Sequence, residues 1–166
     1  MWCVINVTVR NAYVERTLLT TIVCNKEEMA CDLQMTVAGI MKVKAKTKIY
    51  KIKAHEMHFP VDFLIGFCGS ATEIIDVVDF YERPDIYQHM PKTKNLCGLV
   101  LTADHVIYQF VHPGKWLAVD APYSSVGSGA LTAMGAMSMG ATPKEAILAA
   151  SKIDPFTGMG TKVFKI

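Results

Sequence analysis

The stretch Thr20-Thr21-Ile22-Val23 decides the fold of this chain, because two threonines lead directly into a run of β-branched residues. Such a run favours a strand, and Asp32 follows it just downstream, with Lys48 further on. A threonine that begins a strand can act as a nucleophile if its own α-amino group is free to serve as the base. The 19 residues ahead of Thr20 would then have to be removed. One peptide bond therefore separates a catalytic chain from an inert one.

Length and composition are those of an ordinary globular protein. The 166 residues suffice for one domain with a sizeable core, and 51% of them are hydrophobic while 19% are charged. The formal net charge of +2 is too small to indicate a nucleic-acid partner. No stretch approaches the length of apolar sequence that spans a bilayer. We therefore expect neither a nucleic-acid nor a membrane partner.

The cysteines indicate free thiols rather than a disulfide framework. Their number is odd, no CxxC pair occurs, and each lies in an apolar or strand-like setting: Cys3, Cys24, Cys31, Cys68 and Cys97. We expect buried thiols in a reducing compartment, and no metal site. Residues 1–19 lack the uninterrupted apolar segment of a secretory signal. Both observations favour the cytoplasm, and they do not distinguish a bacterium from a virus-infected cell.

The pattern of apolar and turn residues predicts the order of the elements. Trp2, Val4, Val7 and Val9 alternate with polar residues and predict a strand or an extended pro-segment. Further strands are expected at residues 21–24, 29–32, 42–53, 63–69, 96–102, 106–111, 115–119 and 162–166. Helices are expected at residues 71–81, 130–139 and 143–151, the last with Thr142 as its N-cap. This order indicates an α+β fold of layered sheets with helices outside.

Five segments carry a resemblance to a known family: Leu19–Val23, Asp32–Thr36, Lys48–Ile52, Gly66–Ala71 and Val126–Gly129. They resemble the proteasome β subunits and their bacterial relative HslV, which are N-terminal nucleophile (Ntn) hydrolases. The similarity runs from Thr20 to the C-terminus in the family's order, and the step from Asp32 to Lys48 needs no gap.

The resemblance implies a domain organisation as well as a fold. Residues 20–166 would form the Ntn-hydrolase domain, a four-layer αββα sandwich with antiparallel sheets. Residues 1–19 would form an N-terminal pro-segment or an extra strand. The stretch between residues 81 and 96 is too short for the family's second outer helix, so one outer helix is expected to be missing.

The same resemblance implies three catalytic roles around the first threonine. Thr20 matches the N-terminal threonine whose hydroxyl attacks the scissile carbonyl, and Lys48 matches the lysine of the active site. Asp32 matches the acidic residue that pairs with this lysine. An ammonium group close to a hydroxyl favours deprotonation of the hydroxyl, and a carboxylate behind the lysine holds it charged and oriented.

Five further positions match supporting residues of the family. Ser128 matches the serine of a Gly-Ser-Gly turn, and Asp154 and Thr157 match an Asp-x-x-Ser-Gly motif that supports the threonine amine. Thr157 replaces serine there and keeps the hydroxyl. Thr36 matches a residue that aligns the substrate backbone as an added strand, and Gly69 matches the turn whose amide binds the oxyanion.

Activation of this site requires cleavage between Leu19 and Thr20. A free α-amine has a pKa of about 7.7–8.0 and can accept the hydroxyl proton near neutral pH, whereas an acylated amide nitrogen cannot. Cleavage is expected to be autocatalytic in assembled subunits. Leu19 departs from the glycine that proteasome precursors usually carry at this place.

Each residue also has a structural interpretation when it is taken alone. Thr20 is then a threonine that starts a strand, Ser128 an N-cap, and Asp154 a turn or capping residue. Lys48 is one of six lysines between residues 42 and 53, which usually form a solvated strand face. Only the joint arrangement of these residues favours a catalytic site.

The resemblance implies a threonine-type peptidase that hydrolyses unfolded polypeptides without a metal or cofactor. A homo-oligomeric ring and, by analogy, an ATPase unfoldase that feeds it are the expected partners. The alternative is a non-catalytic Ntn-fold subunit that keeps its N-terminal segment and serves in structure or assembly. A third interpretation is an amidase of small molecules on the same fold.

Overall fold

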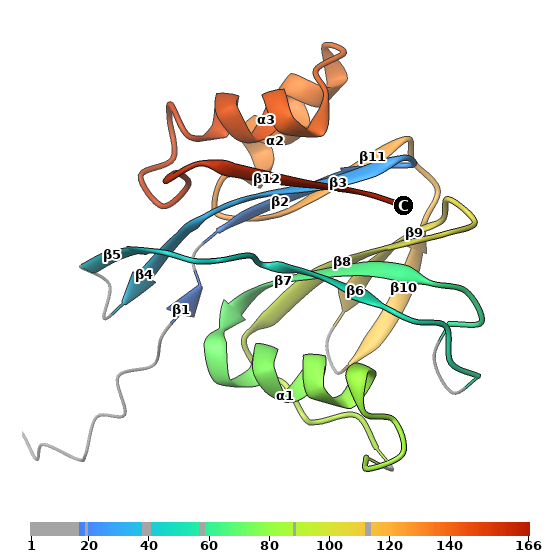
Figure 1. Ribbon diagram of the computed structural model, residues 1–166. Helices are drawn as coiled ribbons and strands as arrows, with labels where there is room; N and C mark the ends of the chain where they lie inside the picture. The colour runs from blue at the N-terminus through green and yellow to red at the C-terminus, as the bar shows by residue number, and fades with distance from the viewer. Residues whose placement is uncertain (1–16, 19, 38–40, 57–58, 88, 112–113) are drawn as a thin grey trace, which may run out of the picture.

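The computed structural model describes residues 17–166 except 19, 38–40, 57–58, 88 and 112–113 (Figure 1). The strand or pro-segment predicted around Trp2–Val9 lies outside the described residues. The strands are β1 (Thr17–Leu18), β2 (Thr21–Asn25), β3 (Glu28–Asp32), β4 (Gln34–Val37), β5 (Met41–Lys44), β6 (Ile49–Ile52), β7 (Phe63–Ser70), β8 (Leu96–Thr102), β9 (Ile107–Val111), β10 (Lys115–Val119), β11 (Tyr123–Gly127) and β12 (Thr161–Lys165). The helices are α1 (Ala71–Glu82), α2 (Ala130–Ser138) and α3 (Pro143–Ala150).

Two large antiparallel sheets form the centre of the molecule. One has the order β1-β7-β8-β9-β10, with β6 also paired to β7, and the other has the order β11-β2-β3-β12. Helices α2 and α3 lie over the four-stranded sheet, and α1 lies under the six-stranded one (Figure 1). The prediction of antiparallel sheets and three helices is therefore confirmed, and the predicted elements occur in their predicted order, with β1, β4 and β11 as strands that the sequence pattern did not predict.

Apolar side chains fill three layers between these elements. Ile22, Leu64 and Leu99 belong to the cluster between the two sheets, and each is completely buried or nearly so. Val77 of α1 packs in a second cluster below the six-stranded sheet, and Ile147 of α3 in a third above the four-stranded one. Strand β7 contributes to both sides of its sheet, as its continuous apolar run predicts.

One predicted strand is wrong in its extent. Residues 42–53 form two strands, β5 and β6, and β5 pairs with β4 as a separate hairpin that the sequence pattern did not predict. The break has a local cause, because the Ile49 amide donates to the Thr47 hydroxyl (3.2 Å), which itself donates to the Ile49 carbonyl (3.0 Å). Such side-chain bonds compete with a strand ladder. The break places Lys48 immediately before β6, with its side chain buried.

The third helix begins as predicted. The Thr142 hydroxyl accepts from the Glu145 amide (3.3 Å), and the Glu145 carboxylate accepts from the Thr142 amide (2.8 Å), which is a complete capping box. Pro143 occupies the first helical position, where its missing N–H costs nothing. No helix in the described part of the chain is long and apolar enough to cross a membrane.

Candidate active site

The two adjacent threonines point in opposite directions, as side chains along an extended segment must. The Thr20 hydroxyl donates to Asp32 Oδ1 and accepts from Lys48 Nζ. The Thr21 hydroxyl instead contacts that of Thr157 at 2.6 Å and accepts from the Gly129 amide at 2.9 Å. Both threonines are completely buried. The pair therefore joins two polar clusters on either side of the chain.

Asp32, the last residue of β3, is the centre of the first cluster. Its Oδ1 accepts from Lys48 Nζ (2.8 Å) and from the Thr21 amide (3.0 Å). Its Oδ2 accepts from the Gln34 and Gly158 amides, each at 3.0 Å. Because both oxygens are fully occupied, the completely buried carboxylate is held in one orientation.

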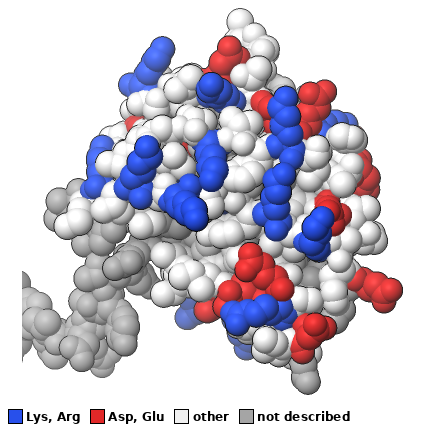
Figure 2. Space-filling model, in the orientation of Figure 1, with Lys and Arg blue, Asp and Glu red and all other residues white. Residues whose placement is uncertain are grey.

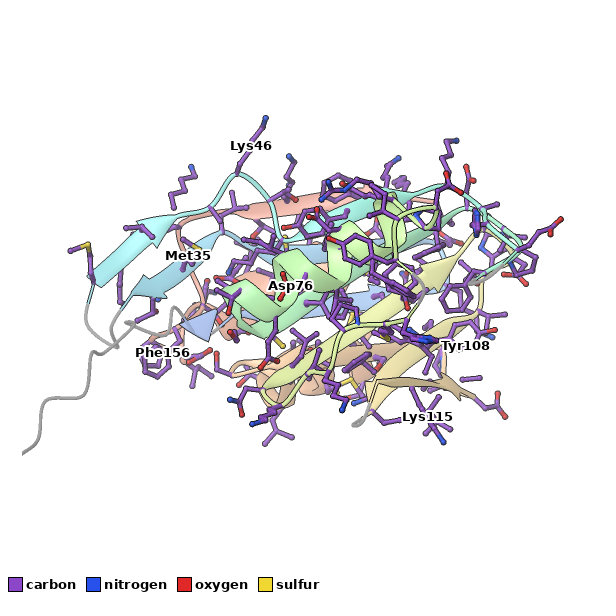
Figure 3. The ribbon with its side chains drawn as sticks, turned by 90° about the horizontal axis from the view of Figure 1, so that it is seen from below. Met35, Lys46, Asp76, Tyr108, Lys115 and Phe156 are labelled. Carbon is purple, nitrogen blue, oxygen red and sulfur yellow. The ribbon has the colours of Figure 1, made fainter. Side chains whose placement is uncertain are left out.

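Lys48 differs from the five lysines that surround it in the sequence. Its side chain is almost fully buried, whereas those at 42, 44, 46, 51 and 53 are exposed. Figure 2 shows basic side chains spread over the face of the molecule along which β5 and β6 run in Figure 1. In Figure 3 the Lys46 side chain points away from the sheets. Burial lowers the pKa of Lys48, and the neighbouring Asp32 carboxylate partly opposes this shift. Lys48 also donates to the Gln34 carbonyl.

The second cluster is built around Asp154. Its Oδ2 accepts from the hydroxyls of Ser128 and Thr157, both at 2.6 Å, and its Oδ1 accepts from the Phe156 amide at 3.1 Å. Burial alone would raise the pKa of Asp154, but these hydrogen bonds hold it below its ordinary value. The Ser128 amide donates to the Thr20 carbonyl at 2.9 Å, which connects this cluster to the first threonine.

Two glycines allow close backbone approaches at the ends of β11 and β7. Gly127 has φ +104°, and a Cβ there would lie 1.8 Å from the Thr20 carbonyl oxygen. Gly69 has φ +129°, and a Cβ there would lie 1.8 Å from the Asn95 carbonyl oxygen. No other residue type fits either position without moving the backbone. The Gly69 turn therefore keeps a fixed shape at the end of β7.

Strand β1 lies against this turn. Thr17 pairs with Ser70 and Leu18 with Gly69, and β1 also contacts β4 on its other side. Strand β1 thus contacts both β7 and β4. Thr36 of β4 is buried, and its hydroxyl has no hydrogen-bond partner in the part of the chain that the structure describes.

Solved structures of other proteins share this fold. HslV from Trypanosoma brucei superposes with a TM-score of 0.66 and 19% sequence identity over 88% of this chain and 98% of that one. The chain shares the HslV fold. A structure of Thiobacillus denitrificans BPH in complex with epoxomicin gives a TM-score of 0.65 and 16% identity, over 89% of this chain and 97% of the BPH chain. Neither a protein-family model nor a curated protein matches the sequence.

The predicted site residues form two hydrogen-bonded clusters and one pair of positions beside β1. Thr20, Asp32 and Lys48 come together in the first cluster, and Ser128, Asp154 and Thr157 come together in the second. Thr36 and Gly69 lie on the two strands, β4 and β7, that flank β1. The described residues contain no group of three or more His, Cys, Asp or Glu arranged to hold a metal ion.

Sequence reasoning missed three contributors to the site. The Thr21 hydroxyl links the threonine pair to Thr157, and the Gln34 and Gly158 amides fix Asp32. The doubled threonine was a usable signal for Thr21, since alternation in a strand sends the second side chain to the opposite face. Nothing in the sequence indicates the two amides, because every residue type except proline supplies one.

Proposed function

We propose that this chain is a threonine peptidase of the Ntn-hydrolase type, with Thr20 as its nucleophile. The observation that carries the proposal is the position of the Thr20 hydroxyl, which bonds both Lys48 Nζ and the Asp32 carboxylate. A buried ammonium group at the hydroxyl stabilises the alkoxide that forms during attack. A structural strand-starting threonine needs neither partner.

The reaction follows from the groups present once residues 1–19 are removed. The α-amine of Thr20 accepts the hydroxyl proton as Oγ1 attacks the scissile carbonyl carbon, and the Gly69 amide receives the oxyanion. The carbon–nitrogen bond then breaks, the leaving amine takes the proton, and an ester remains on Thr20. Water, deprotonated by the same amine, hydrolyses the ester. Ser128, Asp154 and Thr157 support the amine in this scheme.

Strand β1 supports the domain organisation in the proposal, in which residues 1–19 are a pro-segment and residues 20–166 are the mature αββα domain. An extended peptide that binds by strand addition would pair with the Gly69 turn, and β1 already does so. Strand β1 would therefore lie in the proposed substrate site, shortly before the bond that must be cut. The Thr36 hydroxyl, which has no hydrogen-bond partner among the described residues, would align a substrate backbone that replaces β1.

The proposal extends to self-association and to unfolded polypeptides as substrates. Leu131, Met139 and Ile153 lie on or next to the two upper helices and are 90%, 88% and 73% exposed. Exposed apolar groups of this size on neighbouring elements favour contact with another subunit. A ring of such subunits would enclose its active sites, so that folded proteins would have to be unfolded first by an ATPase.

The second candidate is a non-catalytic subunit that keeps residues 1–19. One observation favours it: Thr20 is completely buried in the uncut chain, with β1 paired in place ahead of it. In this case the two polar clusters would only hold the sheets together. The two candidates differ in whether Thr20 reacts with an electrophile.

The test is labelling of the assembled protein, expressed from the full-length sequence so that it can cut itself before Thr20, with a peptide vinyl sulfone, an electrophile that a nucleophilic hydroxyl attacks. We expect one adduct per active chain, on Thr20, and hydrolysis of fluorescein-labelled casein. Thr20→Ala should lose both, whereas Thr93→Ala, which removes another buried threonine hydroxyl, should lose neither. Assembled wild-type protein that gives no adduct and no hydrolysis would favour the non-catalytic subunit.

A further inference from the structure

Two cysteines face each other across the strands next to the proposed site. Cys68 of β7 and Cys97 of β8 are directly opposite in the antiparallel register, and their sulfur atoms are 2.8 Å apart. Directly opposite residues of an antiparallel pair have Cα atoms about 4.5–5.5 Å apart, within the range of about 4.4–6.8 Å that a disulfide requires. The pair can therefore be bridged with only a small adjustment of the two strand ends.

The two thiols have complementary environments. Cys97 is partly exposed, and the hydrogen bond from the Cys68 thiol lowers the pKa of Cys97. The same hydrogen bond, together with burial, raises the pKa of Cys68 well above its ordinary value. Cys97 is therefore the more accessible and more readily ionised thiol, and Cys68 is held behind it, within reach of its sulfur.

The other cysteines of the described residues differ from this pair. Cys24 and Cys31 are completely buried, and burial raises the pKa of Cys24 to about 12 and that of Cys31 to about 11. Such thiols are poor nucleophiles at neutral pH and are shielded from solutes. All the described thiols are free in this structure. Among them, only Cys68 and Cys97 are therefore expected to react with an oxidant.

The position of the pair connects it to the Gly69 turn. Cys68 immediately precedes Gly69, and the Asn95 carbonyl, two residues before Cys97, accepts from the Ser70 amide at 3.1 Å. The two cysteines therefore sit on the two chain segments whose close approach shapes the turn. A covalent bond between them would act directly on the backbone that presents the Gly69 amide.

We propose that Cys68 and Cys97 form an oxidisable dithiol, which a hydroperoxide converts into a cross-strand disulfide beside the Gly69 turn. The Cys97 thiolate attacks one peroxide oxygen, the O–O bond breaks, and hydroxide leaves to give a sulfenic acid. The Cys68 sulfur then attacks Cys97 Sγ and displaces the hydroxyl group as water. In sum, two thiols and one hydrogen peroxide give one disulfide and two waters, and a dithiol reductant restores the thiols.

The consequence for hydrolysis rests on the proposed function. Disulfide formation draws the sulfurs from 2.8 Å to about 2.05 Å and so shifts one strand end against the other. An oxyanion donor must be held to within about 0.5 Å of its productive position. Oxidation is therefore expected to lower the rate of peptide hydrolysis severalfold, and reduction is expected to restore it.

The experiment treats folded, full-length protein with hydrogen peroxide, blocks remaining thiols with N-ethylmaleimide and maps the peptides by mass spectrometry. We expect one disulfide that joins the Cys68 and Cys97 peptides, with Cys24 and Cys31 still free and the link reversed by dithiothreitol. Recovery of Cys68 and Cys97 as free thiols, or oxidation of Cys97 to sulfinic acid without a disulfide, would overturn the proposal that the pair forms a disulfide. This peptide map needs only the wild-type protein and does not depend on whether the protein hydrolyses peptides.

The rate of peptide hydrolysis is measured in a separate experiment. Cys97→Ser is the variant that cannot form the disulfide. Peroxide should slow wild type severalfold and leave the rate of the variant unchanged. A mapped disulfide with an unchanged wild-type rate would overturn the regulatory role. Absence of hydrolysis in both redox states would contradict the proposed peptidase, while the mapped link would still establish the dithiol.

Discussion

Among single residues, Lys48 gives the clearest reason to propose a catalytic site rather than a structural one. A buried ammonium group carries a large desolvation cost, and here it is compensated by Asp32 and by the Gln34 carbonyl. A lysine that only stabilised a strand face would lie in solvent, as its five sequence neighbours do. Its burial against the Thr20 hydroxyl is therefore best explained by chemistry at that hydroxyl.

Lys48→Met is expected to lower the rate of peptide hydrolysis by about 10²–10⁴-fold, because the hydroxyl loses the charge that favours its deprotonation. The variant should still fold, since three backbone amides continue to hold Asp32. Lys46→Met, which changes an exposed lysine two positions away, serves as the matched control. Equal rates for the two folded variants would contradict a catalytic role for Lys48. Circular dichroism establishes that both are folded.

Asp154→Asn is expected to reduce the free energy of unfolding by about 1 kcal/mol at neutral pH, because the hydroxyls of Ser128 and Thr157 lose a charged acceptor. The folded pKa of Asp154 lies below its ordinary value of 3.8. The stabilisation is therefore present above that value and is lost as the pH falls through the folded pKa. Urea unfolding should show the difference between wild type and variant shrinking from about pH 7 to about pH 2.5. A difference independent of pH would contradict this assignment.

The sequence alone predicts the side chains of the site better than its backbone. Thr20, Asp32 and Lys48 are distinctive residue types at a fixed spacing, and the structure brings them together. The Gln34 and Gly158 amides come from β4 and from the turn before β12, and their meeting at Asp32 depends on how the strands pair. Pairing between distant strands has no local signature, so these contacts required the structure.

At the scale of elements, the end of β7 is the most constrained turn near the site. Gly69→Ala is expected to cost about 1–3 kcal/mol of folding free energy, because φ is positive there and the added Cβ meets a backbone oxygen. Gly135→Ala is the matched control. It lies within α2 with no atom within 4 Å of the added Cβ, so it should stabilise the protein by about 0.5–1 kcal/mol. Thermal unfolding shifts of the same sign would contradict this distinction.

The elements themselves were predictable where their pattern was strong. The apolar run of β7, the capping box of α3 and the hairpin of β8 and β9 all carry local signals, and each forms near its predicted position. Strands β4 and β11 were missed because each is short and mixes polar with apolar residues. The break between β5 and β6 was missed because it depends on hydrogen bonds of Thr47 and on the inward turn of Lys48.

At the scale of the whole molecule, the apolar side chains over α2 and α3 predict assembly. Leu131→Asp is expected to convert the protein to monomers, because burying a carboxylate in a subunit contact is costly. Ile75→Asp on α1, where the wild-type side chain is 59% exposed, is the matched control and should leave the assembly intact. Light scattering after size exclusion measures both masses. An oligomer that persists in the Leu131 variant would show that subunits associate through another surface.

The central claim is that this chain becomes a peptidase when the bond before Thr20 is cut. Its most direct test is the intact mass of the assembled protein, with wild type compared to Thr20→Ala. We predict that wild type lacks residues 1–19 and that the variant retains them, because the Thr20 hydroxyl cuts the chain that precedes it. Retention of residues 1–19 by both proteins, folded and oligomeric, would mean that the α-amine is never freed, and would contradict the claim.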